Sequence, residues 1–193
     1  MNQELHIEAG EARARIVEMR YSRSQGILTV TVELLCPVLP AHIAAVKRMV
    51  EDKLDRDPGL QVHFDVSAYS YDTVLDLFCT LVSMENGGLI LGLEQGKMGV
   101  SDSHILLLNR EDNPVLQSKT NLMLLQHLAA AVGRELVLVA EEGDLPLFSI
   151  DAARYRLAAP VSKPQSAAGI KVDKKPSTKS RAKKEEKGRV ILG

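Results

Sequence analysis

His104-Ile-Leu-Leu-Leu108 and Glu135-Leu-Val-Leu-Val-Ala140 are the two apolar runs that bracket the stretch deciding the fold, residues 104–141. Both runs have the length and the apolar or β-branched composition of buried strands. Between them, Asn113-Pro114 is typical of a helix start, with asparagine as the N-cap and proline in the first helical position. The stretch therefore predicts strand, helix and strand.

The segment between these strands carries apolar residues at helical spacing. Leu122, Leu125, Ala129 and Val132 form one stripe, which is the pattern of an amphipathic helix packed on one face. Gly133 follows directly and predicts a C-cap, because glycine adopts the left-handed conformation there without steric cost. The stretch indicates a fold element and no chemistry.

On the N-terminal side the sequence predicts two strands, a helix and a third strand. Ala12–Tyr21 and Ile27–Leu34 are strand-like, and the second alternates apolar and polar residues so that one face is buried. A helix is expected from about Ala41 to Asp55, followed by a strand over Gln61–Ser67. Residues 1–11 show no periodicity and are expected to fray.

The central part of the chain completes a second unit of the same architecture. Asp72 is expected to cap a helix over Thr73–Met84, and Leu89–Leu93 is interpreted as a strand. Val100 is placed in a short strand before the stretch described first, and residues 146–157 are expected to form a short terminal helix. Both halves therefore follow the order ββαβ.

The predicted fold class is α+β, with two small ββαβ, KH-like units joined by a helix. The expected boundaries are 12–84 for the first unit with its connecting helix and 89–157 for the second. A disordered basic linker is expected over 158–187, and the start of a further, OB-like domain over 188–193. Units of about 60 residues are marginal alone, so the connecting helix is expected to join their cores.

The net charge of −1 conceals an asymmetry along the chain. Residues 163–193 hold ten basic and three acidic residues, a balance of +7, whereas residues 1–162 hold 14 basic and 22 acidic residues, a balance of −8. Electrostatic binding of phosphate is therefore expected from the tail rather than from the folded part. We expect no membrane span and no signal peptide, and the isolated Cys36 and Cys79 are interpreted as reduced thiols of a cytoplasmic protein.

Short motifs for ligand binding occur, but each has a plain structural alternative. Gly96-Lys-Met-Gly99 matches the GxxG of KH domains, yet a turn is the favoured interpretation because its neighbours are predicted strands. The loop Asn109–Asn113 lacks the glycine that a dinucleotide site needs. Asp72 and Asp76 are one helical turn apart and fit a metal pair, although a cap and a solvated side chain are favoured.

Neither a catalytic residue nor a cofactor or metal site is nominated. The five histidines are scattered and lack the convergent spacing of a zinc site. The candidate nucleic-acid contacts are basic residues of the tail, with a solubilising linker as the alternative. These residues are Lys171, Lys174, Lys175, Lys179, Arg181, Lys183, Lys184 and Lys187.

Two features together resemble a known family. The ββαβ halves, best matched over Arg13–Ser67 and Met98–Glu142, resemble the N-terminal region of bacterial PolC-type DNA polymerase III alpha subunits. The closing Glu185-Glu-Lys-Gly-Arg-Val-Ile-Leu-Gly193 resembles the start of the OB domain that follows in that family. The helix end Ala131-Val-Gly-Arg134 with the strand after it is the closest part.

The resemblance implies a non-catalytic interaction module of a replicative polymerase. Its parent chain would be a DNA-directed DNA polymerase, while the polymerase, exonuclease and metal-binding motifs of the family lie later in the chain. The implied partners are replisome proteins such as the clamp-loader tau subunit, with DNA contacted through the basic tail. The alternative is a free-standing ββαβ regulatory or ligand-sensing protein, and a small nucleotide-binding enzyme is disfavoured by the glycine-free loop.

Overall fold

The computed structural model describes residues 5–55, 57–109 and 112–155. Residues 1–157 form one compact unit. In chain order the elements are β1 (Leu5–Ala9), β2 (Ala12–Ser22), β3 (Ile27–Leu34), α1 (Pro40–Lys53), β4 (Leu60–Phe64), α2 (Tyr71–Glu85), α3 (Gly87–Leu93), β5 (Met98–Val100), β6 (His104–Leu108), α4 (Pro114–Gln117), α5 (Lys119–Ala131), β7 (Glu135–Val139) and the 3₁₀ helix η1 (Ala152–Tyr155). The prediction of a mixed α and β fold with two small sheets is confirmed.

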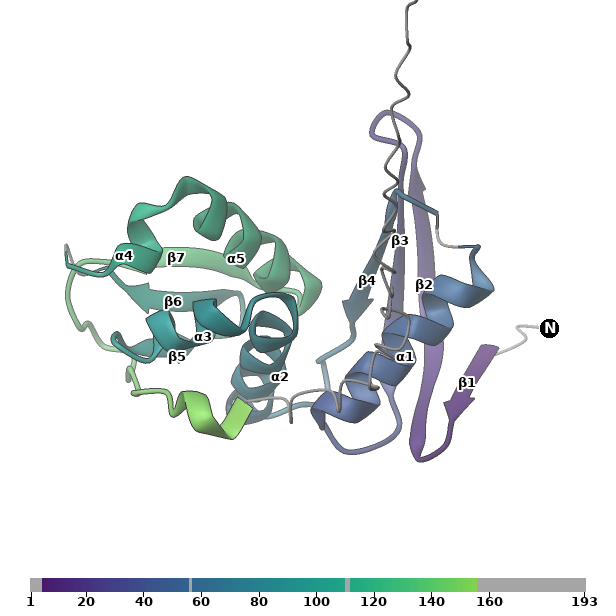
Figure 1. Ribbon diagram of the computed structural model, residues 1–193, viewed down its shortest axis with the longest axis horizontal. Helices are drawn as coiled ribbons and strands as arrows, with labels where there is room; N and C mark the ends of the chain where they lie inside the picture. Colours follow the sequence, from purple (N-terminus) through teal and green to yellow (C-terminus); the bar gives the residue numbers. More distant parts are fainter. Residues whose placement is uncertain (1–4, 56, 110–111, 156–193) are drawn as a thin grey trace, which may run out of the picture. The chain divides into compact units, whose positions relative to one another are not determined.

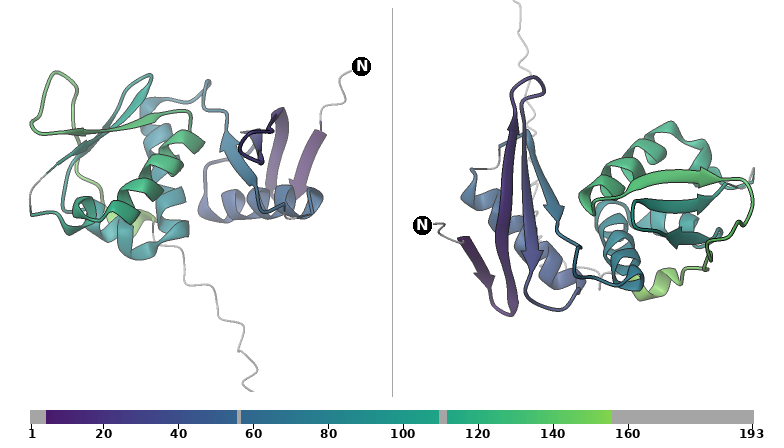
Figure 2. Two further views of the ribbon diagram at one scale, coloured as in Figure 1. Left: turned by 90° about the horizontal axis from the view of Figure 1, so that it is seen from above. Right: turned by 180° about the vertical axis from the view of Figure 1, so that it is seen from behind.

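The first sheet has the strand order β1-β2-β3-β4. Its first three strands are antiparallel neighbours, and β4 is parallel to β3 after the chain has passed through α1. Helix α1 lies along one face of this sheet (Figures 1 and 2). Val30 and Val32 of β3 are fully buried on that face, as their alternation with threonine predicts.

Strand β1 corrects the expectation that the N-terminal residues fray. Ile7 is fully buried, and β1 pairs with β2 over the whole length of β1. Gly10 has φ +64°, so the chain reverses there in a conformation that side chains rarely adopt. One buried isoleucine and a tight turn therefore order a segment whose sequence has no visible period.

Strand β2 contains a β-bulge between Ile16 and Glu18. Ile16 pairs with Val32 and Met19 pairs with Val30, and both partners face the helix. The bulge therefore places Ile16 and Met19 on the same face, although strict alternation would separate them.

The second sheet has the order β5-β6-β7, with β6 antiparallel to β5 and parallel to β7. Its helices lie on one face (Figure 2). The expected helix between the last two strands is present but divided, because Ser118 ends α4 and its hydroxyl accepts a hydrogen bond from the Asn121 N–H, 3.3 Å, as the N-cap of α5. Asn113 caps α4 as predicted, and Gly133 has φ +69° at the end of α5.

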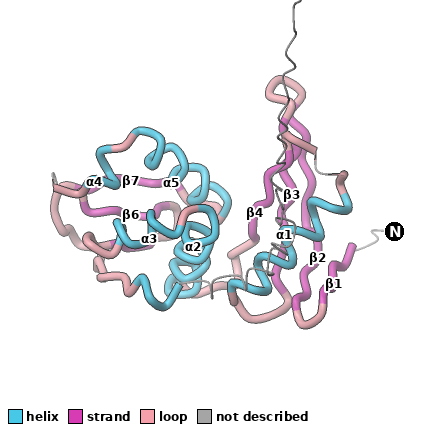
Figure 3. The backbone as a smooth tube through the Cα atoms, in the orientation of Figure 1, coloured by secondary structure: helices cyan, strands magenta, loops and turns pink. Residues whose placement is uncertain are grey.

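Helix α3 corrects the prediction of a strand over residues 89–93. The Asn86 side-chain oxygen accepts hydrogen bonds from the Gly88 and Leu89 N–H groups, which starts a new helix directly after α2 (Figure 3). A Cβ atom at Gly92 would lie 1.7 Å from Val115 Cγ2, so this glycine permits α3 to approach α4 closely. An apolar run this short fits either a buried strand or a buried helix, and the cap decides between them.

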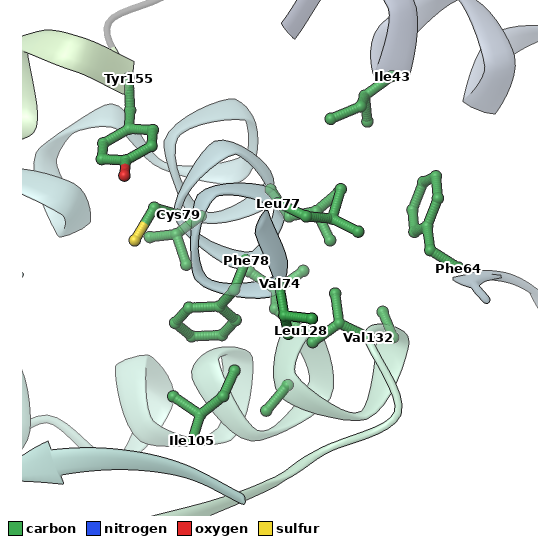
Figure 4. Packing of buried hydrophobic residues seen from close by; sticks show 14 of the residues in the cluster. Ile43, Phe64, Val74, Leu77, Phe78, Cys79, Ile105, Leu128, Val132 and Tyr155 are labelled. Carbon is green, nitrogen blue, oxygen red and sulfur yellow. The ribbon is translucent and has the colours of Figure 1, made fainter. Parts of the chain in front are cut away.

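Helix α2 is the most deeply buried element and contacts α1, α3, α5 and β5. Its fully buried residues point in several directions, with Leu77 and Phe78 on different sides of the helix (Figure 4). Phe78 lies toward Ile105 of β6, and both belong to one continuous hydrophobic core. The expectation that this helix joins the core therefore agrees with its contacts. Within the described ranges, no helix has the length and hydrophobicity needed to span a membrane.

Candidate functional site

An open apolar cavity of about 390 Å³ lies between the start of α2, the edge of β5 and the segment that follows β7. We call it the α2–β5 groove. The residues that line it are Ser70, Tyr71, Asp72, Leu75, Val100, Leu145, Pro146 and Phe148. They come from three separate segments of the chain.

Three large apolar side chains of the groove are unusually exposed. Tyr71 is 50% exposed, Leu145 43% and Phe148 52%. Single exposed apolar residues are ordinary in soluble proteins, but a group of them around one cavity marks a binding surface. The groove is therefore the strongest candidate site in the described residues.

The backbone holds these side chains in fixed positions. Ser70 is the N-cap of α2, and its hydroxyl accepts a hydrogen bond from the Thr73 N–H at 3.3 Å. The prediction that Asp72 is the cap is wrong by two residues, because serine reaches the free N–H groups first. The Tyr71 hydroxyl donates to Asp102 Oδ1 at 2.6 Å, and this hydrogen bond raises the Tyr71 pKa.

Phe148 is anchored to the edge of β5 through its backbone. Its N–H donates to the Met98 carbonyl at 2.7 Å, and its carbonyl accepts from the Met98 N–H at 2.9 Å. A Cβ atom at Gly99 would lie 2.8 Å from the Leu147 side chain, so this glycine lets the same segment pack closely. The Phe148 ring is half exposed, and two backbone hydrogen bonds hold its residue against β5.

The outer edge of β5, which Phe148 occupies at Met98, has one unpaired peptide unit, at Val100. Hydrogen bonds from Ser101 N–H to His104 and from Leu108 N–H to Lys97 set the β5–β6 register. In that register the Val100 N–H and C=O point away from β6. In the register of the antiparallel Met98–Phe148 bridge, Pro146 is the residue opposite Val100, and it lacks an N–H. No described residue hydrogen-bonds to the two outward groups of Val100.

The rim of the groove is acidic. The Asp72 carboxylate makes no hydrogen bond or ion pair with any described residue, and Asp102 accepts only from Tyr71 within the same ranges. A second, more polar cavity of about 310 Å³ adjoins the groove and adds Asp76, Asp151 and Arg154 to this neighbourhood. Its one cation, Arg154, is paired with Asp76 at 3.1 Å. Arg134 is a further cation near the rim: it donates to the Ser101 carbonyl at 2.9 Å, and its charge acts on the Tyr71 hydroxyl. With four carboxylates against two guanidinium groups, the rim still carries a negative balance around an apolar floor.

Asp76 connects α2 to the 3₁₀ helix η1. It accepts hydrogen bonds from the Tyr155 hydroxyl at 2.6 Å and from Arg154 at 3.1 Å, so the expectation of a solvated side chain is wrong. Ser83 donates to the Tyr155 carbonyl at 2.6 Å from the same helix. Burial together with the Asp76 hydrogen bond strongly raises the Tyr155 pKa.

Cys79 lies on the same side of α2 as Tyr155 (Figure 4). Burial raises the pKa of its thiol to about 12, and the nearby Asp76 charge contributes in the same direction. Both cysteines are free thiols, as predicted. A thiol kept protonated inside the core is inert, because the thiolate is the reactive form.

The residues singled out from the sequence do not converge on the groove, except for Asp72. The Gly96–Gly99 segment leads from α3 into β5, so it does not join two helices as a KH loop must. In the described ranges no group of three or more histidine, cysteine or acidic residues has the placement for a metal ion. The tail lysines and Arg181, together with residues 158–193 as predicted linker and domain start, lie outside the described residues.

Sequence reasoning missed the groove because its side chains come from distant segments. One signal was available in Asp144-Leu-Pro-Leu-Phe148, an apolar run with a proline in a region that otherwise has the composition of a loop. Comparison with protein-family models, with curated proteins and with solved structures finds no match to this chain.

Proposed function

We propose that this chain is a non-catalytic interaction module that binds other proteins through the α2–β5 groove. The observation that carries the proposal is the grouping of Tyr71, Leu145 and Phe148, each about half exposed, around one cavity. Contact surfaces between proteins are rich in aromatic residues held in place before binding. The acidic rim disfavours nucleic acid as the partner of this surface.

The biological setting that we propose is DNA replication. The resemblance to the N-terminal region of PolC-type DNA polymerase III alpha subunits supports a cytoplasmic replisome component with two KH-like ββαβ units. Its partner would be a replisome protein such as the clamp-loader tau subunit. In this proposal the polymerase activity belongs to the parent chain, and DNA contact belongs to the basic tail, residues 171–187.

Binding to a purified tau-type clamp-loader subunit tests the replication proposal. We expect the full chain to form a complex detectable by isothermal titration calorimetry, and we expect the mass of the native protein in its source cell to exceed 21.1 kDa considerably. Absence of the complex together with a native mass of 21.1 kDa would remove the replication setting. The control variant is Tyr21→Ala, which should bind as the full chain does. Tyr21 is a 61% exposed tyrosine on β2, outside the groove.

A second candidate function is ligand sensing by a free-standing protein, and the cavity itself favours it. Its volume of about 390 Å³ falls within the range of small-molecule sites, and its lining is mostly apolar. An increase in melting temperature with a small apolar compound, abolished by Leu75→Trp, would support this function. Partially buried Leu75 lines the cavity, so tryptophan there fills space that a ligand would need.

A further inference from the structure

We infer that the α2–β5 groove binds an extended peptide segment of a partner protein that carries an apolar anchor flanked by lysine or arginine. This inference rests on the proposed interaction function and specifies the chemistry of the partner. Three independent features of the groove lead to it: the apolar floor, the charge of the rim and the unpaired edge of β5.

The apolar floor accounts for the anchor. Phe148 presents a half-exposed ring from a backbone that two hydrogen bonds to Met98 hold in place. Tyr71, which lines the groove from α2, is held by its hydrogen bond to Asp102. Because both aromatic side chains are positioned before binding, a leucine or phenylalanine inserted between them loses little conformational freedom of the site.

The rim accounts for the flanking charge. Asp72 has no partner among the described residues, and Asp102 accepts a hydrogen bond from Tyr71 and from no other described residue. The one cation lining the adjoining cavity is already paired with Asp76. A basic peptide therefore gains attraction at this rim, whereas the acidic body of a second copy is repelled.

The edge of β5 accounts for the extended conformation. The Val100 N–H and C=O point away from β6 and have no described partner. They form the donor and acceptor pair that an added strand uses in β-augmentation. Alternate residues of the bound peptide would then face the groove and solvent, because side chains in a strand alternate.

Panning a phage-displayed library of random peptides on the full chain tests the inference. We expect enriched sequences to combine one large apolar residue with lysine or arginine on its flanks. An enrichment of acidic sequences, of nothing, or of peptides that bind equally well to the Phe148→Ala variant would overturn the inference. Tyr21→Ala is the matched control, because it also removes an exposed aromatic ring, from β2.

Synthetic copies of an enriched peptide separate the charge and the backbone contributions by fluorescence anisotropy. Asp72→Lys is expected to weaken binding about 10-fold or more, while Glu8→Lys, the same change at an exposed position of β1, leaves binding unchanged. In a strand, the N–H groups of every second residue face the neighbouring edge. Methylation of the peptide nitrogens that face β5 is therefore expected to abolish binding, and methylation of the other set is expected to leave binding intact. Equal effects of both sets would overturn strand addition.

The outcomes also distinguish this inference from the proposed function. Binding of the tau-type subunit that survives Phe148→Ala would keep the interaction function and remove the groove as its site. Peptide binding without any tau complex would keep the groove and exclude the tau-type subunit as its partner. Light scattering on the full chain decides whether a second copy occupies the groove, since a dimer abolished by Phe148→Ala would overturn the peptide inference.

Discussion

Gly92 shows how one missing Cβ atom sets the distance between two helices. Alanine at this position would bring its Cβ to 1.7 Å from Val115 Cγ2, inside the core. We expect Gly92→Ala to lower the free energy of unfolding by about 1–3 kcal/mol, because a close-packed core does not accept an additional methyl group. Urea denaturation measures the change.

Gly87 provides the matched control for this substitution. It lies in the same helix, and a Cβ atom there would meet nothing within 4 Å. Gly87→Ala should therefore leave stability within about 0.5 kcal/mol of the parent protein. An equal loss of stability in both variants would contradict this. It would show that replacing glycine by alanine in the helix backbone, rather than the contact with Val115, determines the effect.

Cys79 makes the stability of the protein dependent on alkaline pH. The folded state keeps the thiol protonated up to about pH 12, whereas the unfolded thiol ionises near its ordinary pKa. Above that value the unfolded state binds fewer protons, so stability falls as pH rises, by up to about 1.4 kcal/mol per pH unit. We expect Cys79→Ala to flatten this fall between about pH 9 and 10.5, measured by urea denaturation at each pH.

Ser83→Ala is the control for the thiol, because it removes another buried polar side chain of α2 without removing an ionisable group. It should lower stability while the parent pH slope is retained. Tyr155 shifts in the same direction and remains in both variants, and Cys79 contributes to its shift. The difference between the two slopes therefore measures the thiol together with its effect on Tyr155. Equal slopes in Cys79→Ala and the parent protein would contradict the assignment.

At the scale of the element, β1 is the strand that the sequence did not predict. Ile7→Ala is expected to destabilise the protein by about 2–5 kcal/mol, since the side chain is fully buried and its removal leaves a cavity. Leu5→Ala, two residues earlier in the same strand and 51% exposed, should have a much smaller effect. Thermal unfolding of both variants measures the difference, and similar melting temperatures would show that β1 is not anchored by Ile7.

Elements with a regular period were predictable, and those decided by tertiary contacts were not. The alternation in β3 and the stripe in α5 required only the local sequence. A strand was predicted where α3 lies, because the helical conformation of this segment depends on the Asn86 cap and on the space beside Val115. The split at Ser118 has the same origin, because a serine hydroxyl starts α5 where periodicity alone continues one helix.

The candidate site was less predictable than the elements. Exposure of Tyr71 and Phe148 is a property of the assembled fold, and their spacing of 77 positions gives no local signal. Asp76 was interpreted as a solvated residue because its partners Arg154 and Tyr155 lie on a distant segment. Sequence patterns locate cores well, but they do not show which surface residues gather around one cavity.

At the scale of the whole molecule, the separation of charge gives a prediction about DNA. Residues 1–162 carry −8 and residues 163–193 carry +7. We expect any binding of the full chain to duplex DNA to be non-specific, to weaken steeply with salt and to disappear when the eight candidate basic residues of the tail are changed to glutamine. Electrophoretic mobility shifts at several salt concentrations measure this.

The control compares single and double glutamine substitutions in the tail with the same number of substitutions in the folded part. Arg23 and Arg48 serve for this, since neither makes an ion pair with a described residue. DNA binding that survives loss of the tail charges would mean that the folded part holds a phosphate-binding surface despite its acidic balance.

The contacts between α2 and η1 also affect the protein during its synthesis. Ser83 and its partner Tyr155 are 72 positions apart in sequence. At about 5–20 residues per second, a ribosome needs about 4–14 seconds to deliver the second after the first. During that interval the side of α2 that holds Cys79 lacks its cover, and nascent chains with uncovered apolar surface are clients of chaperones. This side of α2 therefore stays exposed to chaperones until η1 has been synthesised and can pack against it.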